Sequence, residues 1–190
     1  MNILIVGVGG QGTLLSSRVL GKYAEFIGKE CKLSEVHGMA QRGGSVVTHV
    51  RMADKVYAPI ITTGDADILI AFEELEALRW KHYLKKDGIL VANSQKIFPM
   101  PVIMGKEKYP DNIQKDCEST AKSYFVNAVE IAEQAGSAKA TNIVMLGAVC
   151  ALCSLDKDLF KKSVESCVPP KFLELNVKAF EMGYNAVANK

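Results

Sequence analysis

The sequence predicts an α/β protein with three layers, in which a mostly parallel, Rossmann-like sheet lies between helices. Two observations carry this prediction. Short β-branched apolar runs alternate with amphipathic stretches along the first two thirds of the chain, and the first run leads directly into a glycine turn and a helix. The last third is predicted to be helical. Because the chain contains no repeat or linker, residues 1–190 are expected to form a single domain.

The amino-terminal elements follow from residue type and spacing. Residues 2–6 are apolar and β-branched, which is typical of a strand covered on both faces. The glycine-rich segment 7–12 breaks this strand and opens a helix, for which Gly28 is the expected stop signal. Further strands are expected at 31–36 and at 45–52, where the second alternates apolar and polar residues.

The later elements follow from the same kinds of signal. Pro99 and Pro101 mark a loop, and the segment 143–153 is predicted to be a buried helix because it is apolar throughout. The remaining predictions are a strand at 66–72, a helix at 73–84, a turn at Asp87-Gly88, strands at 89–92 and 123–127, a helix at 128–135, and a final helix behind Pro169-Pro170.

Composition excludes several classes of protein. The formal net charge is only +2, and no cluster of Lys and Arg lies beside a row of aromatic residues, so no nucleic-acid partner is expected. The longest apolar run, 143–153, is well short of the roughly 20 residues that a membrane span needs. No signal peptide is predicted at the amino terminus. We therefore expect a cytoplasmic protein without a membrane partner.

The five cysteines are an odd number and do not form a disulfide framework, so free thiols are expected. Cys150 and Cys153 form a C-x-x-C pair, a spacing that can bind zinc, hold a cluster or exchange disulfides. The pair lies in the apolar helix, however, and no second pair exists to complete four ligands. Two buried structural cysteines are therefore expected, and no metal site.

The glycine turn Gly7-Val-Gly-Gly-Gln-Gly12 matches the fingerprint of a dinucleotide-binding loop. It follows a strand and opens a helix, whose first N–H groups and positive dipole end can bind a phosphate. Glu35 lies about where a ribose-binding carboxylate would fall. A tight turn between strand and helix needs glycine in any case, so a nucleotide site and a purely architectural turn both stay open.

A second motif bears on the choice between a nucleotide site and a purely architectural turn. Ser34-Glu-Val-His-Gly-Met-Ala-Gln-Arg-Gly-Gly-Ser45 is long and unusual, and together with the glycine turn it resembles the gamma-type domain of 2-oxoacid:ferredoxin oxidoreductases. The resemblance extends to about Gly147. Its further motifs are His49-Val-Arg51, Val56-Tyr-Ala-Pro-Ile60, Gly64-Asp-Ala-Asp67, Asn93, Tyr109-Pro110 and Asn142-Ile-Val-Met-Leu-Gly147. Because His37-Gly-Met-Ala-Gln-Arg42 replaces the loop typical of pyruvate-type members, the chain is most similar to the indolepyruvate branch.

The resemblance implies a reaction and a distribution of its cofactors between two subunits. In this family a 2-oxoacid is decarboxylated on thiamine diphosphate, electrons pass through iron–sulfur clusters to ferredoxin, and the acyl group goes to coenzyme A. The chain lacks the cysteine runs of a cluster site. Gly64-Asp65 and Asn93 mimic a thiamine motif, but Ala66 stands where glycine is expected. Thiamine diphosphate, magnesium and the clusters are therefore expected on a large alpha subunit in a hetero-oligomer.

The resemblance also assigns candidate site residues. No cofactor is expected to be firmly bound by this chain; if the glycine turn has a ligand, coenzyme A rather than NAD is expected there. No catalytic residue is assigned. His49 is expected to have a structural role, and His82 is expected to lie on the surface. The candidates are Gly7, Gly9, Gly10, Gln11 and Gly12 for the coenzyme, and His37, Gln41, Arg42, Gly43 and Gly44 as a loop facing a shared active site.

Two other functions remain open. The first is a stand-alone NAD(P)-dependent oxidoreductase with a Rossmann fold, and the second is a coenzyme A or nucleotide-binding module without chemistry of its own. If the family resemblance holds, the chain should have no redox activity alone. Its apolar helix at 143–153 is also expected to need covering by another chain.

Overall fold

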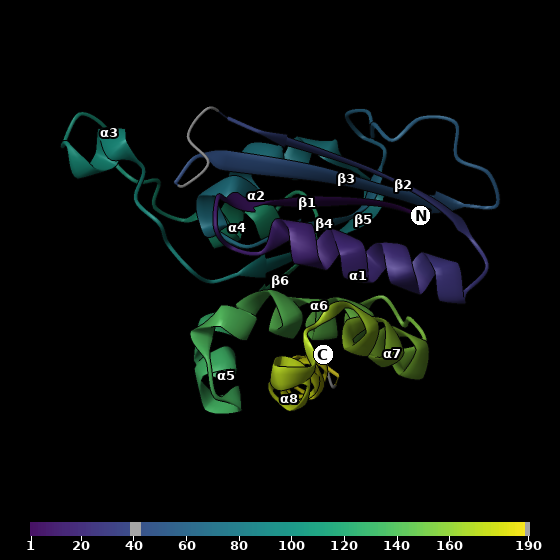
Figure 1. Cartoon of the computed structure of the whole chain (residues 1–190). Coiled ribbons are helices and arrows are strands. Elements are labelled where there is room, and N and C mark those ends of the chain that lie inside the picture. Colours follow the sequence, from purple (N-terminus) through teal and green to yellow (C-terminus); the bar gives the residue numbers. More distant parts are fainter. Residues whose placement is uncertain (39–42, 189–190) are drawn as a thin grey trace.

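The computed structural model describes residues 1–38 and 43–188 (Figure 1). Short 3₁₀ turns lie at Lys81–Tyr83, Ala138–Ala140 and Pro170–Phe172. The strands and helices are, in chain order, β1 Asn2–Val8, α1 Thr13–Phe26, β2 Glu30–His37, β3 Ser45–Ala53, β4 Ala66–Ala71, α2 Glu74–Trp80, β5 Leu84–Asn93, α3 Met100–Ile103, α4 Ile113–Glu118, β6 Lys122–Val126, α5 Ala128–Ala135, α6 Thr141–Leu152, α7 Lys157–Cys167 and α8 Leu173–Asn185.

The six strands form one sheet in the order β2-β3-β1-β4-β5-β6. Strands β1, β4, β5 and β6 are parallel neighbours, whereas β3 runs antiparallel to both β1 and β2. Five of the six strands therefore point the same way, and the predicted mostly parallel sheet is confirmed. The sheet differs from a dinucleotide-binding fold in one respect, because the antiparallel β3 separates β2 from β1.

The two faces of the sheet carry separate hydrophobic cores. Along β1, Ile3 and Ile5 pack with α1, α5, α6, α7 and α8, while Leu4 and Val6 pack with α2 and α4 on the opposite face. This alternation is the period-two pattern of a strand covered on both sides. The predicted three layers are thus confirmed, with the larger helical layer lying below the sheet in Figure 1.

Helix α6 is the centre of the larger core. Residues 142–150 are all buried, and α8 packs closely against this helix. Gly147 and Gly183 permit the contact: a Cβ atom on Gly183 would lie 2.1 Å from the carbonyl oxygen of Val144. The expectation that this apolar helix needs another chain to cover it is therefore wrong, because the carboxyl-terminal helices of the same chain cover it.

Smaller differences between the predicted and the observed elements also have local causes. Asp87 and Gly88 do not end a strand; Asp87 has a φ of 67° inside β5, where the pairing with β4 shifts register. The helix predicted to run to residue 84 ends at Trp80 and continues as a 3₁₀ turn. The loop expected around Pro99 and Pro101 contains the short helix α3. No helix within the described residues is long and apolar enough to cross a membrane.

The close crossing of α6 and α8 gives a stability prediction. A Cβ atom at Gly147 would lie 2.2 Å from the carbonyl oxygen of Phe180, and backbone cannot move aside as a side chain can. We expect Gly147→Ala to lower the free energy of unfolding by about 2 kcal/mol or more, because the helices must separate. Chemical denaturation measures this change.

Gly21→Ala is the matched control for this variant. Gly21 lies within α1, and the nearest atom to an added Cβ is Cδ1 of Leu33 at 3.7 Å. Alanine fits there and is the better helix former, so the free energy of unfolding should rise by about 0.5–1 kcal/mol. Wild-type stability in Gly147→Ala would contradict the close packing of the two helices.

Candidate functional site

The glycine turn connects the carboxyl end of β1 to α1 and is held by its own backbone. Gly10 and Gly12 have φ values of 104° and 87°, a region that favours glycine. Gly7 packs so closely that a Cβ atom there would lie 3.2 Å from that of Phe72. The N–H of Gly9 donates to the carbonyl oxygen of Gly44 at 2.9 Å. The two motifs singled out in the sequence are therefore hydrogen-bonded to each other.

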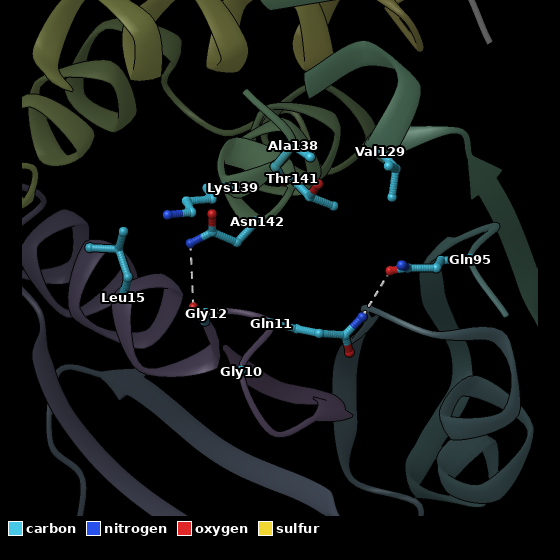
Figure 2. A pocket seen from close by; sticks show the side chains of 10 residues that line it. All are labelled: Gly10, Gln11, Gly12, Leu15, Gln95, Val129, Ala138, Lys139, Thr141 and Asn142. Carbon is cyan, nitrogen blue, oxygen red and sulfur yellow. Dashed lines mark hydrogen bonds between the residues drawn. The ribbon is translucent and has the colours of Figure 1, made fainter. Parts of the chain in front are cut away.

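Gln11 joins the carboxyl ends of three strands. Its Oε1 accepts from the N–H of Val8 at 2.7 Å, which closes the turn on itself. Its Nε2 donates to the carbonyl oxygen of Phe72, just after β4, at 2.9 Å. The same nitrogen donates to Oε1 of Gln95, just after β5, at 3.0 Å (Figure 2). The candidate residue Gln11 thus cross-links the sheet edge on which the site lies.

An open pocket of about 520 Å³ lies beside the turn at this edge (Figure 2). The backbone N–H groups of Thr13, Leu14 and Leu15, the first of α1, have no acceptor among the described residues. Free N–H groups and the positive dipole end make a helix start a binding site for anions. The residues lining the pocket are Gly10, Gln11, Gly12, Leu15, Gln95, Val129, Ala138, Lys139, Thr141 and Asn142.

The start of α6 forms the far wall of this pocket. Asn142 is 3% exposed, and its Nδ2 lies 3.4 Å from the carbonyl oxygen of Gly12. A Cβ atom on Gly12 would lie 2.8 Å from that nitrogen, so the contact requires glycine. Lys139 is exposed on the preceding 3₁₀ turn. The pocket therefore has one flexible cation on its wall and adjoins the helix start, whose residues Thr13 and Leu14 line a neighbouring pocket; cations and amide donors of this kind suit phosphate groups.

A second pocket, of about 420 Å³, lies on the other side of the turn. Gly9, Gly10 and Gly12 line it together with Glu35 and His37 of β2. His37 is exposed, and its Nδ1 lies 3.4 Å from the carbonyl oxygen of Gly38. Two candidate residues, Gln41 and Arg42, lie outside the described residues. The loop candidates that are described, His37, Gly43 and Gly44, lie at the same edge as the turn.

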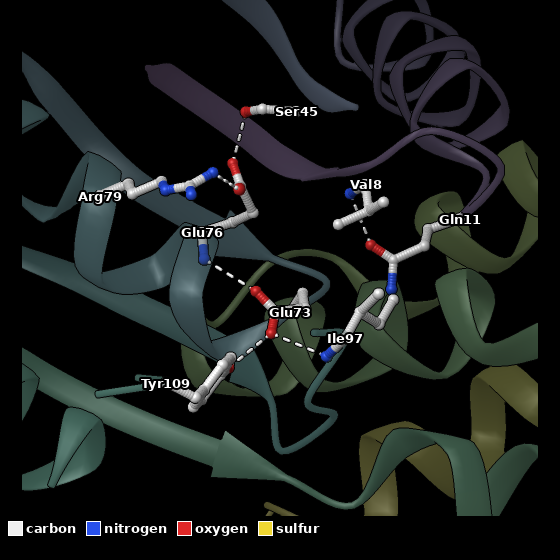
Figure 3. Close-up of polar contacts among 8 residues, drawn as sticks. All are labelled: Val8, Gln11, Ser45, Glu73, Glu76, Arg79, Ile97 and Tyr109. Atoms are coloured by element: carbon white, nitrogen blue, oxygen red, sulfur yellow. Dashed lines mark hydrogen bonds and ion pairs between the residues drawn. The ribbon is translucent and has the colours of Figure 1, made fainter. Parts of the chain in front are cut away.

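Three buried glutamates, Glu73, Glu74 and Glu76, follow β4 at the same edge, and Figure 3 shows Glu73 and Glu76. Glu73 accepts hydrogen bonds from the N–H of Ile97 at 3.0 Å and the hydroxyl of Tyr109 at 2.6 Å. Burial and the bond to Glu73 raise the pKa of Tyr109, so this hydroxyl remains a donor. Glu76 accepts from the hydroxyl of Ser45 and pairs with Arg79. Each carboxylate drawn in Figure 3 is thus satisfied, as burial requires.

The other polar residues that the sequence analysis considered make hydrogen bonds within the fold or lie on its surface. His49 is buried, its Nδ1 accepts from the N–H of Ile61 at 3.1 Å, and burial lowers its pKa. His82 is exposed. Asn93 donates to the carbonyl oxygen of Phe72 and accepts from the N–H of Ala128, which ties β5 to its neighbours. Oε2 of Glu35 accepts from the hydroxyls of Thr13 and Thr48, linking β2 to α1 and β3.

The cysteine pair lies at the end of α6. Cys150 is fully buried and Cys153 is half-buried, and all five cysteines are free thiols. Burial raises the pKa of Cys150 to about 12 and that of Cys153 to about 11. Among the described residues, no group of three or more His, Cys, Asp or Glu side chains is placed to hold a metal ion. The pair is therefore part of the core.

Thiol labelling tests this conclusion. With pKa values of about 12 and about 11, Cys150 and Cys153 are almost entirely protonated at pH 8. An ordinary thiol with a pKa near 8.5 is about one quarter thiolate at that pH. We expect iodoacetamide to label both cysteines at least about a hundredfold more slowly in the native chain than in guanidinium, as mass spectrometry would measure. Rapid native labelling, or a disulfide between them, would show a reactive pair instead.

Sequence reasoning does not single out Gln95, Lys139 or Thr141 as site residues, because they lie far along the chain from the glycine turn. Asn142 stands in a motif of the resemblance, but nothing local places it against Gly12. The helix start at Ser137, whose side chain accepts from the N–H of Lys139, is the one local signal that could have indicated this wall of the pocket.

Comparisons with known proteins indicate the same family as the sequence motifs do. The family model described as pyruvate ferredoxin/flavodoxin oxidoreductase matches residues 2–186. The chain is 43% identical to indolepyruvate oxidoreductase subunit IorB of Archaeoglobus fulgidus, over 97% of this chain and 94% of the relative. It is 39% identical to the same subunit of Thermococcus kodakarensis, over 97% and 95% of the two chains.

The fold agrees with a solved structure from the same group. The gamma subunit of a keto/oxoacid ferredoxin oxidoreductase from Geobacter sulfurreducens superposes with a TM-score of 0.75 and 28% identity. The match covers 100% of this chain and 99% of that one. The predicted resemblance is thereby confirmed over nearly the full length, and the chain belongs to the pyruvate ferredoxin/flavodoxin oxidoreductase family.

Proposed function

We propose that this chain is the small subunit of an indolepyruvate:ferredoxin oxidoreductase, which decarboxylates an aryl 2-oxoacid to an acyl-CoA and passes the electrons to ferredoxin. The observation that carries this proposal is the 43% identity to an indolepyruvate oxidoreductase subunit over nearly the whole length of both chains. The glycine turn and the loop at residues 37–44, which carried the sequence resemblance, lie together at one edge of the sheet, and this arrangement supports it.

The role of this chain at the site is to bind and orient coenzyme A. The phosphates lie against the free N–H groups at the start of α1, where even a Cβ atom added to Gly10 would have no neighbour within 4 Å. Lys139 lies on the opposite wall of the pocket and supplies a positive charge. Gln11 holds the turn in place. When bound, the coenzyme supplies the thiol that receives the acyl group.

The remaining cofactors belong to a partner in this proposal. A large alpha subunit holds thiamine diphosphate, magnesium and the iron–sulfur clusters, and ferredoxin reaches the clusters through the assembled hetero-oligomer in the cytoplasm. The loop formed by His37, Gln41, Arg42, Gly43 and Gly44 faces the active site shared with that subunit. This placement is supported by the hydrogen bond between Gly44 and Gly9, which fixes the base of the loop beside the coenzyme site.

The assignment of the redox cofactors to the partner is tested by separating the subunits. Purified alone, this chain should be colourless and should not reduce methyl viologen with indolepyruvate and coenzyme A. Mixed with its large partner, it should co-elute in gel filtration and restore turnover, with indolepyruvate preferred over pyruvate and 2-oxoglutarate. A brown chromophore, NAD(P)H-dependent activity of the lone chain, or failure of the two chains to associate would each contradict the proposal.

The loop is tested separately with Arg42→Ala. Loss of a charge-assisted hydrogen bond in the shared site should lower kcat/KM for the assembled enzyme about tenfold or more. The melting temperature of the chain and its association with the partner should stay unchanged. Arg18→Ala is the control, since Arg18 is an exposed arginine on α1 away from the loop. Equal turnover of the two variants would exclude a role of Arg42 in the shared site.

A further inference from the structure

The segment between β5 and α4, residues 94–112, forms an arm that projects from the carboxyl edge of the sheet. Figure 1 shows its short helix α3 standing away from the rest of the molecule. The turn at its tip closes on itself, since the N–H groups of Val102 and Lys106 donate to the carbonyl oxygens of Pro99 and Pro101, each at 2.9 Å. Residues 98–112 are all described, and none of them is buried.

The base of the arm is held in a defined position by the fold. Glu73, which is 1% exposed, accepts the N–H of Ile97 on one limb and the hydroxyl of Tyr109 on the other, at 3.0 and 2.6 Å. The rings of Phe98 and Tyr109 pack edge to face, with 5.2 Å between their centroids. These contacts give the Tyr109-Pro110 motif of the sequence a structural role, and they fix the direction in which the tip is presented.

The tip of the arm, residues 98–108, exposes four large apolar side chains. Phe98, Met100, Ile103 and Met104 are between 53% and 64% exposed. Together they present roughly 400 Å² of apolar surface, which is as large as the patches that mark interaction sites on monomeric proteins. Two of the four are methionines, whose flexible side chains adapt to the surface that covers them. The tip therefore has the character of a protein contact.

The size and the place of the tip identify the kind of partner. A stable interface buries about 800 Å² on each side, so the tip supplies only about half of one and could not by itself hold a second copy of this chain. It must be one part of a larger contact surface. The arm leaves the sheet at the edge where β2 ends at His37 and where the glycine turn lies (Figure 1). That edge is the one that the proposed function places against the large subunit.

Charged side chains beside the tip indicate what surrounds the apolar contact. Lys106 and Lys108 are exposed, and neither has an ion-pair partner among the described residues. Glu107 is the one acid between them. An apolar tip with an excess of positive charge at its rim fits a groove that is apolar inside and has carboxylates around its mouth.

We propose that the arm is a docking element, whose apolar tip inserts into a groove of this kind on the large subunit, next to the shared active site. The inference rests on the proposed function and goes beyond it by naming a surface that joins the two chains. Because the bonds to Glu73 fix the base of the arm before assembly, little conformational freedom is lost when the tip is covered.

Protection from trypsin tests the contact in the wild-type chains. Trypsin should cleave the lone chain after Lys106 and Lys108, because both lie in an exposed turn. In the complex with the large subunit, both cleavages should slow at least about tenfold, since a covered segment cannot enter the protease. Lys55 is the internal control: it is exposed after β3, at the opposite edge of the sheet, and should be cleaved equally in both samples. Unchanged cleavage at Lys106 and Lys108 would contradict the docking.

Variants of the tip test the contact directly. Ile103→Asp and Met104→Asp should each raise the Kd for the large subunit about tenfold or more, because a carboxylate would enter the apolar groove. The melting temperature of the lone chain should stay unchanged, since both side chains are exposed. Once the large subunit is in saturating excess, kcat and the KM for indolepyruvate should return to wild-type values, which separates docking from catalysis. Tyr57→Asp is the control, because Tyr57 is 82% exposed at the opposite edge, and it should bind as wild type does.

The outcomes distinguish this inference from the proposed function. If Ile103→Asp and Met104→Asp associate with wild-type affinity, the inference fails while the subunit assignment stands. Binding of the lone chain to vesicles of phosphatidylcholine and phosphatidylglycerol that either substitution abolishes would assign the tip to a membrane surface and overturn the inference. Dimerisation of the lone chain that either substitution abolishes would assign the tip to a second copy and overturn it equally. If the wild-type chain and the large subunit do not associate, both the proposed function and this inference fail.

Discussion

The structure at the carboxyl edge of the sheet depends on how closely the backbone of the first turn approaches its neighbours. The N–H of Gly9 bonds to Gly44, and the carbonyl oxygen of Gly12 contacts Asn142. From the same turn, Gln11 reaches the ends of β4 and β5. Side chains at Gly7 or Gly12 would collide with these partners, so only glycine backbone can make the approach. The turn therefore joins segments that are far apart in the sequence.

The antiparallel strand β3 explains why the second motif meets this turn. Strand β2 runs in the same direction as β1 and ends at His37, at the edge where β1 also ends. Because β3 starts at that edge and returns between them, His37 and Gly44, at the two ends of the connection between β2 and β3, lie beside the glycine turn. A parallel crossover would have needed a long connection in its place. The strand order thus brings the two motifs together.

Buried carboxylates stabilise the segments at the other half of the carboxyl edge of the sheet. Glu73 accepts from Ile97 and Tyr109, which flank the segment that carries α3, and from the N–H of Glu76. In Figure 1 this segment projects from the same side of the molecule as the end of β2 at His37. Burying a charge is costly unless it is fully hydrogen-bonded, and these bonds offset that cost. The projecting segment is therefore anchored at both ends rather than by its own short helix.

The sequence by itself determined the local elements, including β1, α1 and α5, and two motifs of the site, because strand and helix periods and the need for glycine are properties of neighbouring residues. Only the tertiary structure decided that β3 is antiparallel, that α8 covers α6 through Gly147 and Gly183, and that Lys139 and Asn142 complete the pocket. Strand partners, helix crossings and pocket walls depend on contacts between residues far apart in the chain, and no local pattern encodes which of the possible partners packs best.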